Sequence, residues 1–121
     1  MEKYNKVWGD TAPIFHKNNV ESHLINVNPF SFCSKHCHNH KYNMFLVVEG
    51  ELWVSVWKSY GLVDVTHLKP GESMKVAPGE FHQFESKSSS CKALEFYWTE
   101  ISPEDIQREN TGGLTNTKDV V

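Results

Sequence analysis

Residues 38–50 read His-Asn-His-Lys-Tyr-Asn-Met-Phe-Leu-Val-Val-Glu-Gly, so two histidines two positions apart run into an apolar stretch that ends at a glycine. On a β-strand, side chains at i and i+2 lie on the same face, about 6.6–7 Å apart along the chain. Imidazoles at that spacing can converge on one ion at about 2.0–2.1 Å each. We therefore take His38 and His40 as candidate metal ligands.

A second stretch, residues 71–82, begins at Gly71 and passes through Pro78-Gly79 to His82. Proline fixes one backbone angle of a turn, and glycine allows a conformation that a side chain would obstruct. His82 then starts another apolar strand. A barrel can bring this strand beside residues 38–40, so the three histidine nitrogens would face one interior point and bind a divalent metal ion, with Zn, Mn, Fe or Ni as candidates.

The chain around these stretches alternates apolar and polar residues between turn signals, which is typical of a sandwich or barrel. Helical features appear only near residue 103, where a serine and a proline begin a short predicted helical turn, 103–109. We expect three parts: 1–29, an irregular lead-in and first strands that cover the barrel; 30–100, the barrel core; and 101–121, the short helix and a flexible tail. The expected strands are 20–27, 31–40, 42–48, 51–57, 62–68, 73–76, 81–85 and 91–98.

Length and charge limit the classes of partner. The 121 residues amount to one domain, and the formal net charge is -3. Arg108 is the one arginine and no basic stripe occurs, so nucleic acid is not an expected partner. No apolar run has the length of a membrane span or resembles a secretory signal, so we expect no membrane partner and a cytoplasmic location.

The three cysteines, Cys33, Cys37 and Cys91, favour free thiols over a disulfide framework. A Cys33–Cys91 pairing stays open as an alternative. A zinc knuckle of Cys33 and Cys37 with His38 and His40 is a rival metal site. On an unbroken strand, however, the two cysteines share the face opposite the two histidines.

The stretches 38–50 and 71–82 resemble the two motifs of the cupins, and the resemblance covers about residues 30–98. It implies an all-β cupin double-stranded β-helix, a jelly-roll barrel. The sequence departs from the motifs at Phe32, Ala77 and Ser86, and Asn43 stands where the family has its glutamate ligand. The resemblance thus implies either a three-histidine site with water or a site in which the Asn43 amide is a fourth, uncharged ligand.

Asn43 is an odd number of residues from His38 and His40, so on an unbroken strand its side chain would lie on the opposite face. It can face the same cavity only if residues 41–42 interrupt the strand with a bulge or corner.

Three further features resemble the cupin domains of mannose-6-phosphate isomerases and GDP-mannose pyrophosphorylases. The first is the gap of two residues between His40 and Asn43, the position of the family's glutamate ligand. The others are the lead-in Val7-Trp8-Gly9 and the ending 104–108. The resemblance implies aldose–ketose isomerisation of a sugar phosphate, in which a metal polarises the carbonyl and a base moves a proton.

The base in such a reaction would be Glu95, His36 or Lys41. Glu95 sits on an apolar strand, where burial can raise a carboxyl pKa. The alternative for Glu95 is a surface acid on an edge strand. Cationic groups for a phosphate would be Lys41, Lys75 and Arg108.

Fold alone does not give function. The isomerase or epimerase therefore stands beside a non-catalytic carbohydrate-binding or sensor cupin, a metal-dependent dioxygenase and a purely structural barrel. Both faces of residues 42–48 and 51–57 are apolar, and a small barrel has one interior. We therefore predict a homodimer with Trp53 or Trp57 near the interface. The alternative is that residues 1–27 cover the second face.

Overall fold

The computed structural model describes residues 1–99 and 104–115, and this part of the chain is almost entirely β-structure. A single 3-10 turn, η1 (Ser59–Gly61), interrupts the strands. The strands are β1 (Tyr4–Lys6), β2 (Gly9–Lys17), β3 (Val20–Val27), β4 (Tyr42–Glu49), β5 (Leu52–Trp57), β6 (Val63–Leu68), β7 (Ser73–Val76), β8 (Phe81–Glu85) and β9 (Cys91–Trp98).

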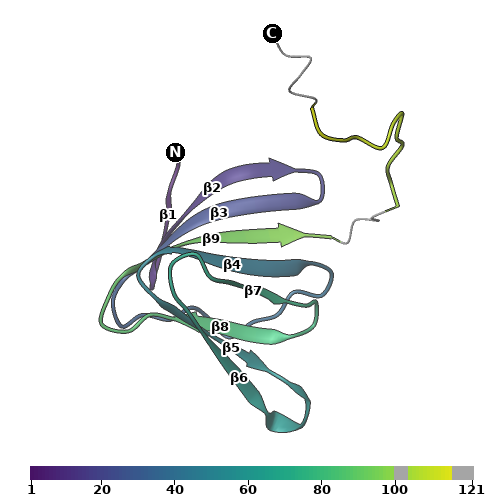
Figure 1. Cartoon of the computed structure of the whole chain (residues 1–121). Coiled ribbons are helices and arrows are strands. Elements are labelled where there is room, and N and C mark those ends of the chain that lie inside the picture. The colour runs from purple at the N-terminus through teal and green to yellow at the C-terminus, as the bar shows by residue number, and fades with distance from the viewer. Residues whose placement is uncertain (100–103, 116–121) are drawn as a thin grey trace.

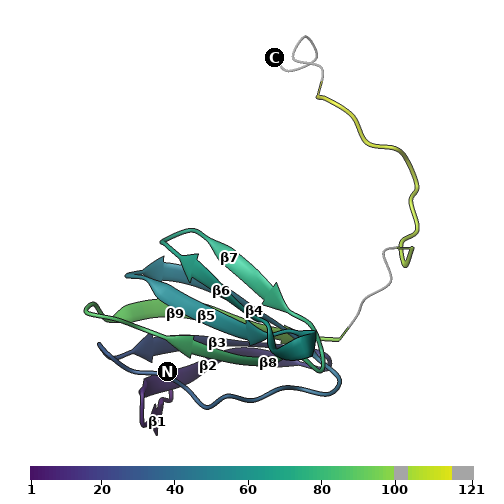
Figure 2. The ribbon, with the colours of Figure 1, turned by 90° about the horizontal axis from the view of Figure 1, so that it is seen from below.

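The strands form two antiparallel sheets that face each other (Figures 1 and 2). One sheet has the order β1-β2-β3-β9-β4-β7 and the other β6-β5-β8. The chain crosses from one sheet to the other four times, between β4 and β5, β6 and β7, β7 and β8, and β8 and β9. This arrangement confirms the predicted jelly-roll barrel. In the described residues, no helix is long and apolar enough to cross a membrane.

The predicted strands 20–27, 73–76, 81–85 and 91–98 have the observed bounds, but the lead-in differs from expectation. Residues 1–18, which contain none of the expected strands, hold two strands, β1 and β2. Asn18, with φ 53°, and Asn19 join β2 to β3 in a two-residue hairpin. Asparagine tolerates this left-handed conformation, so the turn aligns β2 with β3 along its whole length.

Residues 31–40, expected to be an extended segment, touch β8 at two isolated bridges, Phe32↔Glu85 and His36↔His82. The segment therefore lies along the edge of the three-stranded sheet as an interrupted strand. The predicted helical turn at 103–109 is wrong over its described residues, 104–109, which are exposed and not helical; residue 103 lies outside the described residues. A single turn with no apolar face against the barrel lacks the packing that stabilises short helices.

Side chains alternate between the two faces of each strand, so every second side chain packs in a core between the sheets. β4 shows this clearly, since Asn43, Phe45 and Val47 are buried and their neighbours are half-buried. The core cluster consists of Ile25, Val27, Cys33, Phe45, Val47, Leu52, Val54, Val56, Leu68, Val76, Phe84, Cys91 and Ala93. Gly50 allows the tight β4–β5 connection: its φ is +77°, and a Cβ there would lie 2.2 Å from the carbonyl oxygen of Ser90.

All three cysteines are free, as predicted, and Cys33 and Cys91 are buried. Burial raises the pKa of both thiols to about 11. A shift of about two units lowers the reactive thiolate fraction about 100-fold. In a Cys37→Ser variant at pH 8, we expect both remaining thiols to react with a disulfide reagent at least about 100-fold more slowly in the native than in the urea-unfolded protein. Equal rates in the two states would show that the thiols are not enclosed.

Candidate metal centre

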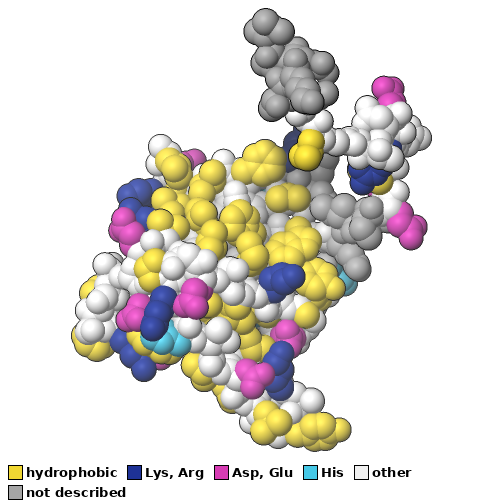
Figure 3. Space-filling model, viewed as in Figure 1, with side chains coloured by type: hydrophobic (Ala, Val, Ile, Leu, Met, Phe, Trp, Pro, Cys, Tyr) yellow, Lys and Arg dark blue, Asp and Glu magenta, His cyan; other side chains and the backbone are white. Residues whose placement is uncertain are grey.

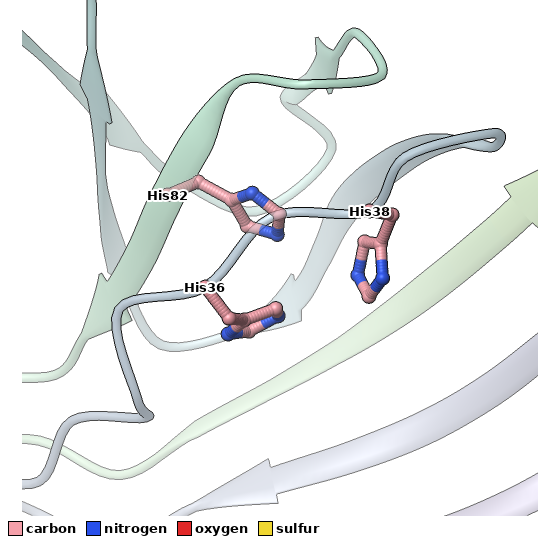
Figure 4. A group of neighbouring side chains, drawn as sticks. All are labelled: His36, His38 and His82. Carbon is pink, nitrogen blue, oxygen red and sulfur yellow. The ribbon is translucent and has the colours of Figure 1, made fainter.

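Three histidines meet inside the open end of the barrel (Figure 4). His36 and His38 come from the β3–β4 connection and His82 from β8. One ligand nitrogen from each lies within 4.8 Å of those of the other two. The ring centroids are 5.0 Å apart for His36–His38, 4.5 Å for His36–His82 and 5.5 Å for His38–His82.

Backbone hydrogen bonds hold the segments that carry these rings. The His36 N–H donates to the His82 carbonyl at 3.1 Å, and the His82 N–H donates back at 2.8 Å. The N–H of Gly79, in the turn before β8, donates to the His38 carbonyl at 2.8 Å. The three imidazoles are therefore positioned by the main chain and need little rearrangement to bind a common ligand.

Neighbouring backbone carbonyl groups determine the tautomer of two of these histidines. The Nδ1 of His36 lies 2.7 Å from the Ser34 carbonyl oxygen, and that of His82 lies 3.0 Å from the Glu80 carbonyl oxygen. A carbonyl can only accept, so Nδ1 carries the hydrogen and Nε2 keeps a lone pair. Outer hydrogen bonds of this kind orient metal-binding histidines.

In the part of the chain that the structure describes, three buried side-chain atoms lack a hydrogen-bond partner, and two of them belong to this group. Among the described residues, the Nε2 atoms of His38 and His82 and the Oδ1 of Asn43 are buried with no hydrogen-bond partner. Leaving a buried polar atom unpaired costs about 1–3 kcal/mol, so a group of them calls for a ligand. A metal ion would satisfy the imidazole nitrogens, and the residues present therefore fit one.

The charge state also suits a metal. Burial is the largest cause that lowers the pKa of His38 to about 4, and Lys41 adds to it. Burial likewise lowers the pKa of His82. Both rings are therefore neutral near pH 7, which is the form that binds metal ions.

The structure brings His38 and His82 together, as the sequence predicted, but joins them with His36 rather than His40. His40 is exposed on a bend at residues 39–40 and lies outside the three-histidine group. His36 and His38 are also two positions apart, so the spacing argument applied equally to this pair. The same bend interrupts the alternation of side chains before β4 begins. Asn43 therefore faces inward, although it is an odd number of residues from His38.

Asn43 is 1% exposed, and its Nδ2 donates to the Phe96 carbonyl at 3.1 Å. This bond orients the amide and leaves Oδ1 without a partner. The rival zinc knuckle does not form in the described residues, where neither Cys33 nor Cys37 belongs to the group that can hold a metal.

A cavity of about 420 Å³ opens beside the histidines, between the six-stranded sheet and residues 33–36. It is lined by Lys6, Trp8, Thr11, Glu21, His23, Cys33, Ser34, His36, Lys41, Phe84, Glu95 and Tyr97. The three predicted catalytic residues, Glu95, His36 and Lys41, therefore share one cavity. Lys75, on β7, and Arg108, in the tail, are exposed and do not line it, so the three expected phosphate-binding cations are not assembled.

Buried Glu95 and half-buried Tyr97 form a hydrogen-bonded pair in this cavity. Glu95 is 9% exposed, and burial raises the pKa of its carboxyl group, although a hydrogen bond from Tyr97 opposes the shift. Burial and the neighbouring Glu95 raise the pKa of Tyr97. The Tyr97 ring packs edge-on against His38, with centroids 5.1 Å apart, and the Nζ of Lys41 lies 4.1 Å above it. Tyr97 thus connects Glu95 to the metal-binding group.

Comparison with known proteins gives the fold but no close relative. No family model matches the sequence, and no curated protein matches it. Among solved structures, KdgF from Halomonas sp. aligns over 84% of this chain and 88% of its own, with 12% identity and a TM-score of 0.72. The cupin domain of Schizosaccharomyces pombe Cnp3 aligns over 83% of this chain and 69% of its own, with 11% identity and a TM-score of 0.71.

The chain has the cupin fold. Oxalate decarboxylase from Bacillus subtilis, a protein with Mn(II) centres, aligns over 87% of this chain at 13% identity and a TM-score of 0.73. This chain spans only 29% of that protein's length. Identities this low carry the fold and leave the activity to be argued from the site.

Proposed function

We propose that this cupin is a metal-dependent isomerase or epimerase of a small carbohydrate-like molecule. The observation that supports it is the shared cavity. One member of the three-histidine group that fits a metal ion, His36, and a buried carboxyl group, Glu95, line the same cavity. Moving a proton between adjacent carbons needs these two elements, a group that polarises a carbonyl and a nearby base.

The metal would be held by His36, His38 and His82, with the Oδ1 of Asn43 as a neutral fourth ligand. Neutral imidazoles suit Zn, Mn, Fe and Ni, and a site without a carboxylate ligand leaves the ion with its full charge. A bound divalent ion supplies Lewis-acid polarisation of a substrate carbonyl.

The residues of the chain then divide the remaining tasks. Glu95 takes the proton from the carbon next to the carbonyl and returns it to the neighbouring carbon, passing through an enediol. Tyr97 orients Glu95 through its hydrogen bond. Lys41 stands at the cavity wall, where its ammonium group can bind a hydroxyl or anionic group of the substrate.

This assignment is tested by exchange in D₂O with metal-loaded protein and a panel of hexoses and hexose phosphates. A proton removed by Glu95 exchanges with solvent, so we expect deuterium in recovered substrate or product by mass spectrometry. Glu95→Gln should reduce exchange at least about 100-fold, the lower range for general base catalysis, while metal content stays unchanged. Glu85→Gln, which changes an exposed glutamate on β8, is the matched control and should retain exchange. Equal exchange by the Glu95→Gln variant would refute the role of Glu95.

A non-catalytic carbohydrate-binding or sensor cupin is the second candidate, and Asn43 favours it. The amide replaces the acid of the cupin motif, so the site loses a charge that would tune a catalytic metal. Binding of a sugar, seen by calorimetry, with no exchange or turnover for any member of the panel would select this second function.

A further inference from the structure

The outer side of the six-stranded sheet is apolar across three strands. Along β3, β9 and β4, the residues that point away from the core meet in cross-strand rows, such as Leu24↔Leu94↔Leu46 and Val20↔Trp98↔Tyr42. We call this set the apolar face; it consists of Val20, Leu24, Tyr42, Met44, Leu46, Leu94, Phe96 and Trp98. All eight side chains are only half-buried, and Figure 3 shows apolar side chains gathered over this sheet.

The described part of the chain does not cover the apolar face. β1 and β2 extend the same sheet at its edge instead of crossing over it. The described tail, 104–115, is exposed throughout, and its large apolar residues are only Ile106 and Leu114. The alternative that residues 1–27 cover a second apolar side therefore does not apply to this sheet.

The apolar face is large enough for the apolar centre of a dimer interface, and the polar rim would lie on the strands beside it. Its three strands span about 14 Å across and five residues span about 17 Å along them, or about 240 Å² in projection. Side-chain relief enlarges this area, and Phe15 and Val48, 53% and 44% exposed, extend it. Each partner of a standard complex buries about 800 Å².

The chemistry of the apolar face suits a second copy of the chain. None of the eight side chains of the face is charged. Lys75, on β7, pairs with Met44 at one border, and the pair of Glu49 on β4 with Lys92 on β9 lies at another. A two-fold axis through the face would therefore place apolar rows on apolar rows and leave the charges at the rim. Two sheets packed in this way interdigitate at about 10 Å.

The two tryptophans expected at the interface are already covered from within the chain. Trp53 stacks on His67 with centroids 4.3 Å apart, and the Nζ of Lys87 lies 4.6 Å from its ring. The Nζ of Lys35 lies 4.0 Å from the Trp57 ring. These contacts cover the two tryptophans, while Val65, on the same side of the three-stranded sheet, is 59% exposed.

We propose that the protein is a two-fold homodimer that packs through the apolar face. Because side chains alternate along a strand, β4 and β9 place the apolar face on one side and Asn43, Phe45, Glu95 and Tyr97 on the other. The partner subunit would thus support the strands that form the back wall of the metal-binding cavity.

The test is the mass in solution by light scattering and by sedimentation, from about 1 to 100 μM, for the wild type and two variants. These concentrations bracket the dissociation constants of ordinary specific complexes. We expect twice the 13.9 kDa chain mass for the wild type. Leu46→Glu should raise the dimer Kd at least about 100-fold, because each dimer would bury two unpaired carboxylates. Val65→Glu changes a residue that is 59% exposed on β6, in the other sheet, and should leave the dimer intact.

A wild-type monomer throughout this range would overturn the proposal. So would a dimer that survives Leu46→Glu and dissociates with Val65→Glu. If Leu46→Glu does not fold, the wild type alone decides, because the midpoint of thermal unfolding of a dimer rises with protein concentration and that of a monomer does not. None of these outcomes depends on the metal or on turnover, so the dimer and the proposed isomerase can fail separately.

Discussion

Replacing His82 with alanine should weaken the binding of a divalent metal by more than about 100-fold. Loss of a residue that merely supports a metal ligand already costs about 10–100-fold in affinity, and His82 is expected to be a ligand itself. Its Nε2 is buried, has no partner among the described residues, and belongs to the three-histidine group. The measurement is calorimetric titration of chelator-treated protein with Zn²⁺ or Mn²⁺.

His40→Ala is the matched control, since it removes an imidazole two residues from His38 that lies outside the group. It should bind metal as tightly as the wild type, whereas His36→Ala should resemble His82→Ala. The reverse pattern, with His40→Ala impaired and His36→Ala unaffected, would place the ion on the pair that the sequence first indicated.

Phe45→Ala should lower the free energy of unfolding by about 3–5 kcal/mol, the range for a buried aromatic side chain cut back to a methyl group. Phe45 is 1% exposed at the centre of β4. Its ring meets Phe84 edge-on at 5.8 Å and His82 at 6.3 Å, so it joins the two sheets beneath the metal-binding group. Urea unfolding followed by tryptophan fluorescence measures the change.

Phe81→Ala provides the comparison for this prediction. Phe81 is 46% exposed on β8, next to His82, so its truncation should change stability by no more than about 0.5–1 kcal/mol. Similar losses for the two variants would mean that Phe45 does not hold the sheets together. Metal affinity should also fall in Phe45→Ala, because the ring that packs against His82 is gone.

The strands were predictable because alternation and turn residues both mark them. In β4, inward Phe45 and Val47 alternate with outward Met44 and Leu46, and Gly50 ends the strand at a turn that requires a positive φ. The same local signals placed β7, β8 and β9. Local chemistry of this kind is visible in a sequence because it repeats every two residues.

The parts that sequence reasoning missed depend on contacts between distant residues. Two overlapping histidine pairs, 36/38 and 38/40, have the same spacing, and the choice between them rests on the bridge from His36 to His82. The predicted helical turn had favourable end residues but no surface to pack against. The Asn18–Asn19 hairpin did carry a local signal, since asparagine favours the left-handed conformation of such turns.

The most direct test of the metal centre is elemental analysis of the protein purified without chelator or histidine tag, alongside His36→Ala and His82→Ala. We expect about one transition-metal ion per wild-type chain and almost none in either variant. A wild-type protein that holds no metal, even after incubation with zinc, manganese, iron or nickel, would contradict the account, as would metal retained by both variants.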